Sequence, residues 1–481
     1  MDDRHGEITP APNRAARRAS ARKARRATGA ALTAGSAALA ATAGVVATPA
    51  PAGAATFTVT NLDPTGPGSL DQAIQDANAA GGPDVIDFAA GLAGTIELTA
   101  DLTTITEDVD IQGPGADVIT VDGGDTFVLF EFAGGLASSI SGLTITNGSN
   151  TKGGGIQADV GDLTVTGVVV SSSTADFDGG GVQCSNNGLL TISFSTVTGN
   201  RADSDAGGGL YADTCDLDIS YSTFSGNTAF DEAGGLYIDG NALIRNTTIA
   251  GNEAGSDGGG ILVTSDSDET VTIANSTITG NSAVGEGGGV IIGEGELIVV
   301  QSTISGNMSG ATTGGIYTGE AGATVAEDDD EAAKGQDVGV LADGDLSLTG
   351  TIVTDNSGFD LRGTGTIGVI TSDHSLLGSV DPDTTVDDLG GNLFDQDPGL
   401  GPLADNGGPT QTMALLEASA ALDAGPDPVP DFPGNEFDQR GTGFLRVAFG
   451  RVDIGAYELQ EPEPPGPPGP TPIVLEPTFT G

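Results

Sequence analysis

Short stretches in which apolar and polar residues alternate run through most of the chain. Residues 190–194 (LTISF) and 271–274 (VTIA) are examples, and their alternation predicts β-strands that bury one face. A repeat unit with three such stretches leaves no room for a helix. The pattern therefore predicts an all-β chain and disfavours leucine-rich and helical repeats.

The stretches belong to a repeat that the residue pair Gly-Asn marks. The hexapeptides around this pair read STVTGN, STFSGN, TTIAGN, STITGN and STISGN, and the steps between their asparagines are 27, 25, 29 and 26 residues. These asparagines are Asn200, Asn227, Asn252, Asn281 and Asn307. A step that recurs in this way indicates a solenoid rather than one compact core.

A second marker keeps the same phase. A Gly cluster ends eight or nine residues after each asparagine and leads into an apolar residue, as in Gly209-Leu210 and Gly260-Ile261. The two markers predict a right-handed parallel β-helix over residues 151–380, with an acidic loop insertion at 319–340. Its coils would stack ~4.8 Å apart. We expect each asparagine to bond to those above and below it in a left-handed turn, and the Gly clusters to form the next corner.

The N-terminal part, residues 55–150, is predicted to hold a cap and the first coils. Ser69 and Gln72 have the spacing of a helix capping box, and Gly81 follows the helical pattern. The apolar face of this short helix would consist of Leu70, Ile74 and Ala77. Because the end of a β-helix exposes apolar core and unpaired strand edges, we expect this helix to cover the first coil.

Composition and charge narrow the function. The chain has 78 Gly and no Trp among 481 residues, which suits a narrow core of small and β-branched side chains. Its formal net charge of −51 would repel nucleic acid and anionic membrane surfaces. We therefore expect no nucleic-acid partner, and polysaccharide or cell-surface and matrix components as partners.

Residues 1–54 have the pattern of a secretory signal peptide. Eight basic residues lie within the first 26, an Ala-rich run follows from Gly29 to Val46, and Ala52-Gly53-Ala54 is an A-x-A cleavage pattern. A transmembrane anchor is the alternative, although Ala and Gly make a poor membrane span. The pattern predicts an extracellular protein, secreted or attached to the cell surface, by Sec or twin-arginine export.

The chain has two cysteines, Cys184 and Cys215, on neighbouring repeats. An exported protein favours a disulfide that ties adjacent coils. Two buried free thiols are the alternative.

Both ends of the chain resemble segments of bacterial surface proteins. Residues 57–124, with GPGSLDQAIQDAN and DVDIQGPGADVITVDG, resemble the CSLREA-type N-terminal segment, although Gly68, Asp71 and Gln72 replace its Cys, Arg and Glu. The repeats are similar to those of pectate-lyase-like and polymorphic outer membrane proteins. Near the end, DPGLGPLADNGGPTQTMALLEASAALDAG, DQRG and VDIGAYE resemble the choice-of-anchor Q domain.

The C-terminal resemblance implies a secreted or cell-surface protein without assigning an activity. It assigns residues 381–460 to an irregular C-terminal cap, and a Pro-rich tail follows at 461–481. Three arginines occur in this region among four acidic residues, and we expect ion pairs between them. They are Arg440, Arg446 and Arg451, with Asp423, Asp438, Asp453 and Glu458.

Acidic residues recur three or four positions before the last Gly of each Gly cluster. They are Asp178, Asp205, Glu232, Asp257 and Glu286. In a β-helix they would form a column, and carboxylates ~5 Å apart repel unless cations bridge them or water solvates them. This leaves two alternatives, a Ca²⁺ site along this edge or a solvated acidic rim.

No catalytic residue is predicted. Nucleophile-elbow, Cys-His and zinc spacings are absent from the sequence, and His374 is expected at the surface. The sequence therefore favours a structural, adhesive or glycan-binding protein. The alternative is a polysaccharide lyase or glycoside hydrolase of the pectate-lyase-like superfamily, which would need paired carboxylates or cation-binding acidic residues in a cleft.

Overall fold

The computed structural model describes residues 54–460, apart from residues 134, 160, 320–343, 364–368 and 449. The predicted signal peptide up to residue 53, nearly all of the predicted insertion and the Pro-rich tail lie outside the described residues. In the part of the chain that is described, no helix has both the length and the apolar character needed to cross a membrane.

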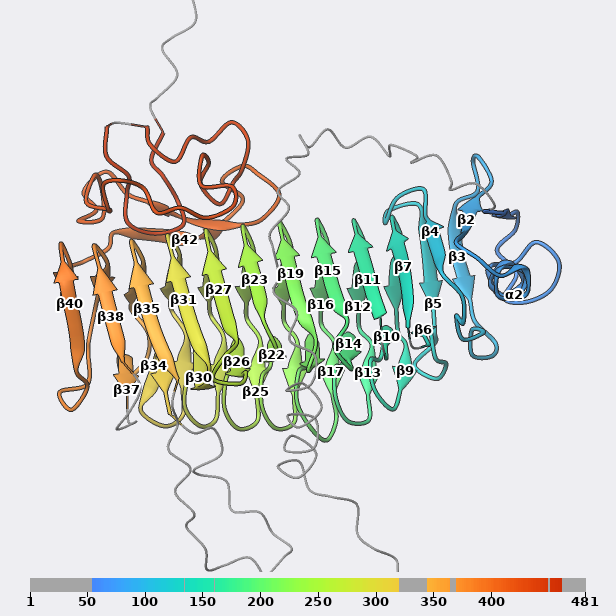
Figure 1. The fold of residues 1–481 in the computed structure, drawn as a ribbon, viewed down its shortest axis with the longest axis horizontal. Coiled ribbons are helices and arrows are strands. Elements are labelled where there is room, and N and C mark those ends of the chain that lie inside the picture. Colours follow the sequence, from blue (N-terminus) through green and yellow to red (C-terminus); the bar gives the residue numbers. More distant parts are fainter. Residues whose placement is uncertain are drawn as a thin grey trace, which may run out of the picture.

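The chain winds into a right-handed parallel β-helix, seen from the side in Figure 1. One coil runs from β14 (Val182–Ser185) in sheet C through β15 (Leu189–Ser193) in sheet A to β16 (Thr196–Thr198) in sheet B. β17 (Arg201–Ala202) in sheet D then leads to β18 (Leu210–Asp213), which pairs in parallel with β14. The predicted fold is confirmed, and a two-residue strand adds a fourth side to the coil.

Sheets A and B are the two longest. In spatial order, sheet A consists of β1 (Thr56–Val59), β2 (Asp84–Phe88), β4 (Val109–Gln112), β7 (Leu136–Ser141), β11 (Gly161–Thr166), β15, β19 (Asp216–Ser220), β23 (Ala242–Arg245), β27 (Thr270–Ala274), β31 (Glu296–Val300), β35 (Asp345–Thr349), β38 (Ile370–Asp373) and β40 (Val386–Gly390). Sheet B consists of β3 (Gly94–Glu97), β5 (Ile119–Asp122), β8 (Thr144–Thr146), β12 (Val169–Ser171), β16, β20 (Thr223–Ser225), β24 (Thr248–Ala250), β28 (Thr277–Thr279), β32 (Thr303–Ser305), β36 (Ile352–Thr354), β39 (Leu376–Leu377) and β41 (Leu393–Phe394).

Sheets C and D complete the coils. Sheet C consists of β6 (Phe130–Phe132), β10 (Ile156–Ala158), β14, β18, β22 (Leu236–Asp239), β26 (Ile261–Thr264), β30 (Val290–Glu294), β34 (Thr313–Thr318) and β37 (Phe359–Gly363). Sheet D consists of β9 (Ser149–Asn150), β13 (Thr174–Ala175), β17, β21 (Thr228–Ala229), β25 (Glu253–Ala254), β29 (Ser282–Ala283) and β33 (Met308–Ser309). β42 (Leu400–Ala404) and β43 (Thr412–Leu415) form a separate antiparallel pair.

The core is built from rows of β-branched and Leu side chains that stack along the axis. In sheet A, Val165 pairs with Ile192 and Ile192 with Ile219, and these side chains are 0 to 1% exposed. Full burial of such a side chain stabilises the fold by ~1.5–3 kcal/mol. A one-residue slip of a strand would turn its apolar row outward, so the row sets the register.

The predicted asparagine ladder is present and buried. Nδ2 of Asn227 donates to Oδ1 of Asn252 at 2.9 Å, and Asn252 donates likewise to Asn281 at 2.9 Å. The Nδ2 group of Asn252 also donates to the carbonyl of Phe224. The ladder continues from Asn307 to Asn356, across a step of 49 residues that the insertion lengthens. Because this step differs from the usual period of about 26 residues, the repeat pattern does not predict Asn356 as a ladder member.

One detail of the predicted turn is wrong. The left-handed residue is the glycine before each ladder asparagine, as in Gly226 with φ 61° and Gly251 with φ 65°, and the asparagines are not among the positive-φ residues. Glycine takes this conformation without a Cβ clash, which leaves the asparagine side chain directed along the ladder. At the Gly clusters the prediction holds, since Gly179 and Gly207 have φ 71° and 72°.

The N-terminal helix α2 (Leu70–Ala80) covers the first coil, as predicted (Figure 1). The Ser69 side chain accepts a hydrogen bond from the backbone N–H of Gln72. The Gln72 side chain donates to Asp76 rather than back to the cap, so only half of the capping box forms. Leu70, Ile74 and Ala77 are buried against the core.

The C-terminal segment, defined here as residues 397–460, is irregular as predicted, but it lies along the side of the β-helix. Figure 1 shows it over the upper ends of strands such as β27 and β31. Asn246 and Asn275 donate to its backbone carbonyls, and Gly455 donates to the carbonyl of Gly350. Its contacts thus begin several coils before β40, and its place differs from the predicted cap at the end of the stack.

Candidate functional site

Four of the five predicted metal ligands share one row at the corner between sheets D and C. Asp178 and Asp257 directly precede left-handed glycines, and Glu232 and Glu286 occupy the same position in their coils. In the remaining coil this position belongs to Ala206, whose carbonyl accepts from Gly179. Asp205 lies one residue earlier, in register with Asp231, whose backbone N–H donates to the carbonyl of Asp205. The expected continuous column is therefore interrupted, because Asp205 has a spacing of four rather than three.

Cationic side chains contact the acidic row at both ends. Lys152 lies 3.1 Å from Asp178, and Arg362 lies 2.8 Å from Glu286 and 3.0 Å from Asp381. Between them, Asp257 accepts the backbone N–H of Glu286 at 2.7 Å. Arg362 comes from β37, beyond the insertion, so the repeat pattern did not reveal it. Part of the row thus serves the protein's own ion pairs and hydrogen bonds.

Among the described residues, no group of three or more His, Cys, Asp and Glu side chains is arranged to hold a metal ion. Calcium binding by Asp178, Asp205, Glu232, Asp257 and Glu286 stays a prediction.

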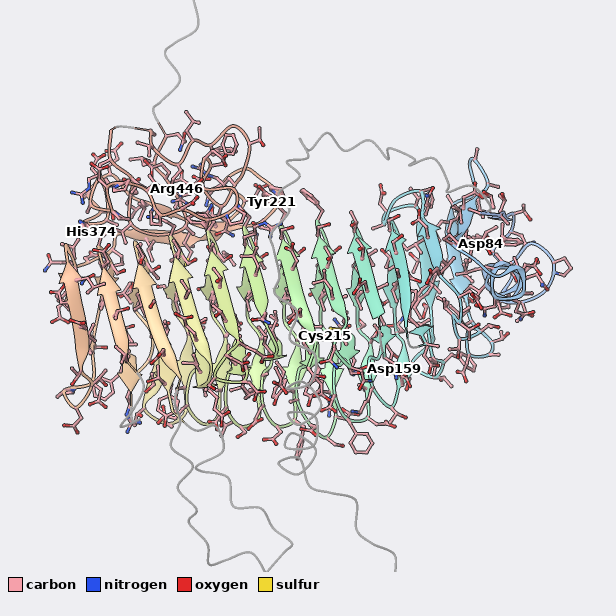
Figure 2. The ribbon with its side chains drawn as sticks, viewed as in Figure 1. Asp84, Asp159, Cys215, Tyr221, His374 and Arg446 are labelled. Atoms are coloured by element: carbon pink, nitrogen blue, oxygen red, sulfur yellow. A yellow bond between two sulfur atoms is a disulfide. The ribbon has the colours of Figure 1, made fainter. Side chains whose placement is uncertain are left out.

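The predicted disulfide between Cys184 and Cys215 is present. Cys184 lies on β14 and Cys215 lies in the following coil before β19, with Cα atoms 6.0 Å apart. Both residues are buried inside the β-helix, and Figure 2 labels Cys215 near its middle. The bond therefore ties adjacent coils from within.

The predicted ion pairs of the C-terminal segment form in part. Arg440 pairs with Asp438 at 2.5 Å, and its guanidinium lies between the rings of Phe444 and Tyr457, 4.0 and 3.8 Å from their centroids. Arg446 instead enters the interface with the β-helix (Figure 2), where it donates to amide and carbonyl oxygens. These arginines hold the segment together and fasten it to the coils.

Two carboxyl groups in the segment are buried and accept backbone N–H groups. Glu458 accepts from Ala448 and Asp453, and Asp453 accepts from Asp423 and Leu459. Burial, reinforced by the neighbouring Asp453, raises the pKa of Glu458 to about 8, and burial also raises the pKa of Asp453. Because both carboxyls bind the backbone around them, we assign them to the structure of the segment.

His374 lies near the surface with its side chain 27% exposed, as predicted. Its Nδ1 atom lies 2.7 Å from Asp373, a partner that the sequence pattern did not indicate.

The corner between sheets A and B carries a row of left-handed residues, called here the corner row. Its members, with φ between 46° and 61°, are Gly142, Gly167, Phe194, Tyr221, Asn246, Asn275, Gln301, Gly350 and His374. The C-terminal segment binds Asn246, Asn275 and Gln301 of this row. The members before Tyr221 belong to earlier coils. They are Gly142, Gly167 and Phe194, so Phe194 has the only side chain longer than glycine's in that part of the row.

Phe194 and Tyr221 stack on each other at this corner. Their ring centroids are 5.0 Å apart and their planes differ by 6°. Figure 2 shows Tyr221 at the edge of the C-terminal segment, where burial raises the pKa of its phenol. Phe194 is 44% exposed, so part of its ring is open to solvent beside the stacked Tyr221.

An uncharged, hydroxyl-rich surface flanks Phe194. It comprises the outward residues nearest the corner on β7, β8, β11, β12, β15 and β16, and we call it the hydroxyl surface. Its members are Ser139, Ser141, Thr144, Thr146, Thr164, Thr166, Val169, Ser171, Thr191, Ser193, Thr196 and Thr198. All but Val169 carry a hydroxyl group, and none is buried. The whole chain has a net charge of −51, whereas this surface has no charged member.

Hydroxyl groups of this surface bond to each other across coils. Thr166 and Ser193 are 3.0 Å apart, and Ser171 donates to Thr146 at 3.0 Å. A hydroxyl group both donates and accepts, so each can take a further hydrogen bond from outside. The sequence pattern does not reveal this surface, because outward positions on two different strands become neighbours only in the folded coil.

Comparison with known families agrees with the fold. Residues 128–307 match the family model described as "Right handed beta helix region", which supports a β-helix repeat protein. Comparisons with curated proteins and with solved structures gave no match. The resemblances to the CSLREA-type segment and the choice-of-anchor Q domain stay predictions.

Proposed function

We propose that this protein is an extracellular β-helix scaffold that binds glycans at the corner between sheets A and B. The observation that carries the proposal is the exposed ring of Phe194 beside the uncharged hydroxyl surface. The C–H face of a sugar ring packs well on an aromatic ring, and its hydroxyl groups exchange hydrogen bonds with Ser and Thr side chains.

The scaffold suits this task because it is preorganised. The rings of Phe194 and Tyr221 are held by backbone that is hydrogen-bonded to the next coil, as in the bond from Phe194 N to Ser220 O at 3.2 Å. A ligand therefore meets groups already in place, which lowers the entropic cost of binding. Adhesion to a cell wall or matrix would follow from such a surface on an exported protein.

Export is part of the proposal. The signal-peptide pattern in residues 1–54 supports it, and so does the disulfide between Cys184 and Cys215, since disulfides persist in oxidising compartments.

The proposal is tested by measuring binding to a panel of insoluble and soluble polysaccharides. We expect Phe194→Ala to weaken binding at least about tenfold, or ~1.4 kcal/mol. Phe230→Ala is the matched control, because Phe230 is 68% exposed but lies after β21, away from this corner. Equal binding by wild type and Phe194→Ala, or no binding to any glycan, would refute the proposal.

The same panel tests the enzymatic alternative. Unsaturated products would indicate a lyase, and new reducing ends would indicate a hydrolase. If such activity is found and is lost in Asp257→Asn, the acidic row rather than Phe194 is the functional site.

A further inference from the structure

The stacked pair of Phe194 and Tyr221 is closed on one side and open on the other. On the closed side, the C-terminal segment packs against Tyr221, and a Cβ atom at Gly441 would lie 3.0 Å from its Cε1 atom. On the open side, the next member of the corner row is Gly167, where a Cβ atom would meet no atom within 4 Å. The ring of Phe194 therefore has free space beside it in the coil of Gly167.

We infer that one sugar ring of the glycan occupies the space over Gly167, as a third ring in the column that Tyr221 and Phe194 begin. This inference rests on the proposed function and specifies where the ligand lies. From that ring, the chain would run along the β-helix axis toward β7 and β8, because the hydroxyl surface continues in that direction. Coils repeat every ~4.8 Å, so successive sugars meet hydroxyl groups of successive coils.

The charges around the hydroxyl surface indicate the class of glycan. Carboxylates lie at its borders: Asp110 accepts from Ser139, Asp122 accepts from Asn147 at 2.9 Å, and Asp162 is exposed. Beyond Tyr221, Asp218 is paired with Arg245 at 2.6 Å. The members of the hydroxyl surface include no Lys or Arg. Uronate or sulfate groups placed between the acidic borders would therefore be repelled. The ligand is therefore a linear glycan without anionic groups.

The end of the surface limits the length that is recognised. At the N-terminal side, residues 113–118 form the connection between β4 and β5, and the carbonyl of Ala116 accepts from Thr144 at 2.6 Å. Three coil steps separate Phe194 from Gly113 in this corner, a span of ~14 Å. A short oligosaccharide fills this span, so longer chains gain no further contacts here.

The deciding experiment fills the space over Gly167 with the protein's own ring. Gly167→Tyr suits this position, because Phe194 and Tyr221 already adopt the same left-handed backbone and nothing lies within 4 Å of the new Cβ. Gly199→Tyr is the matched control: Gly199 has φ 64° and open space around its Cβ, but it lies at another corner. Melting curves followed by circular dichroism confirm that both variants fold.

Calorimetry with neutral xylo-, manno- and cello-oligosaccharides of one to six units, and with oligogalacturonates, gives the readout. For the neutral series that binds, we expect affinity to rise with length up to about three units and then level off, and Gly167→Tyr to lower it at least tenfold while Gly199→Tyr leaves it unchanged. Oligogalacturonates should bind at least tenfold more weakly.

The two proposals fail in different ways. If Phe194→Ala abolishes binding but Gly167→Tyr does not, glycan binding stands and its placement over Gly167 is wrong. If oligogalacturonates bind best, or affinity does not depend on length, the ligand class or the axial path is wrong. If no glycan binds the wild-type protein, both proposals fall.

Discussion

The side-chain amide of Asn227 donates to the side-chain oxygen of Asn252 at 2.9 Å, inside the protein and one coil apart. The same oxygen accepts the backbone N–H of Asn227 at 3.0 Å, so one side chain satisfies two donors of the preceding coil. Buried polar groups of this kind are costly to leave unpaired. The ladder therefore both orders the corner and makes it sensitive to substitution.

We predict that Asn252→Ala lowers the free energy of unfolding by ~3 kcal/mol or more, because it removes the side-chain bonds to Asn227, Asn281 and Phe224 and leaves the buried backbone N–H of Asn227 without its acceptor. Urea denaturation followed by circular dichroism measures the change. Thr272→Ala, at a partly exposed outward position of β27, should change it by less than ~0.5 kcal/mol. A loss of similar size in both variants would contradict a specific role of the ladder.

Arg446 should control the attachment of the C-terminal segment. It is 1% exposed, and its guanidinium donates to Gln301 of the β-helix and to the Gly455 carbonyl of the segment. Burial lowers the pKa of Arg446, while Asp438, Glu458 and Asp453 favour its charged form. Arg446→Met keeps the apolar stem but leaves the buried oxygens of Gln301 and Gly455 without these donors, at a cost of ~3 kcal/mol.

Limited proteolysis measures this effect. In Arg446→Met we expect cleavage within residues 397–460 to become at least tenfold faster, while the β-helix keeps its circular dichroism spectrum. Arg201→Ala is the control, because the Arg201 side chain is 63% exposed. Unchanged cleavage would show that the apolar contacts of the segment suffice to hold it.

Stability should fall as pH rises toward 8. The pKa of Glu458 is about 8 in the folded protein against 4.5 for the free side chain, so between these values the folded state holds a proton that the unfolded state has lost. Its contribution is complete below pH ~4.5 and disappears as pH passes through ~8, and the raised pKa of Asp453 acts in the same direction. Melting temperatures should therefore decrease from pH 5 to pH 8.5.

Glu458→Gln removes this titrating group and keeps the shape of the side chain. We expect its melting temperature to vary less with pH than that of the wild-type protein over the same range. An identical pH dependence in the two proteins would show that other groups cause it.

Calcium distinguishes the two interpretations of the acidic row. Since Lys152 and Arg362 already contact Asp178 and Glu286, we expect millimolar Ca²⁺ to leave the melting temperature nearly unchanged. A bound cation would instead stabilise the folded state by RT ln(1 + [Ca²⁺]/Kd) and so raise the melting temperature. A clear rise that Asp257→Asn abolishes would establish the calcium site that the sequence pattern suggested.

The sequence by itself determined the features that repeat. Apolar alternation, the Gly-Asn marker and the Gly clusters recur in one phase, and each is local to a few residues. In a parallel stack, equal spacing places equal residues above one another, so the β-helix, the Asn252 ladder and the proximity of Cys184 to Cys215 followed. The Ser69 cap of α2 could also be predicted, because it depends on a bond between residues only three positions apart.

The tertiary structure decided what depends on exact register and on distant segments. One extra residue in a single turn moves Asp205 out of the acidic row, and β37 brings Arg362 to Glu286 after an insertion that breaks the period. The C-terminal segment binds the side of the coils through contacts such as Arg446 to Gln301, across 145 residues of sequence. The hydroxyl surface beside Phe194 likewise arises only when outward positions of several strands meet at one corner, because turn lengths and long-range packing, rather than local pattern, set which side chains share a face.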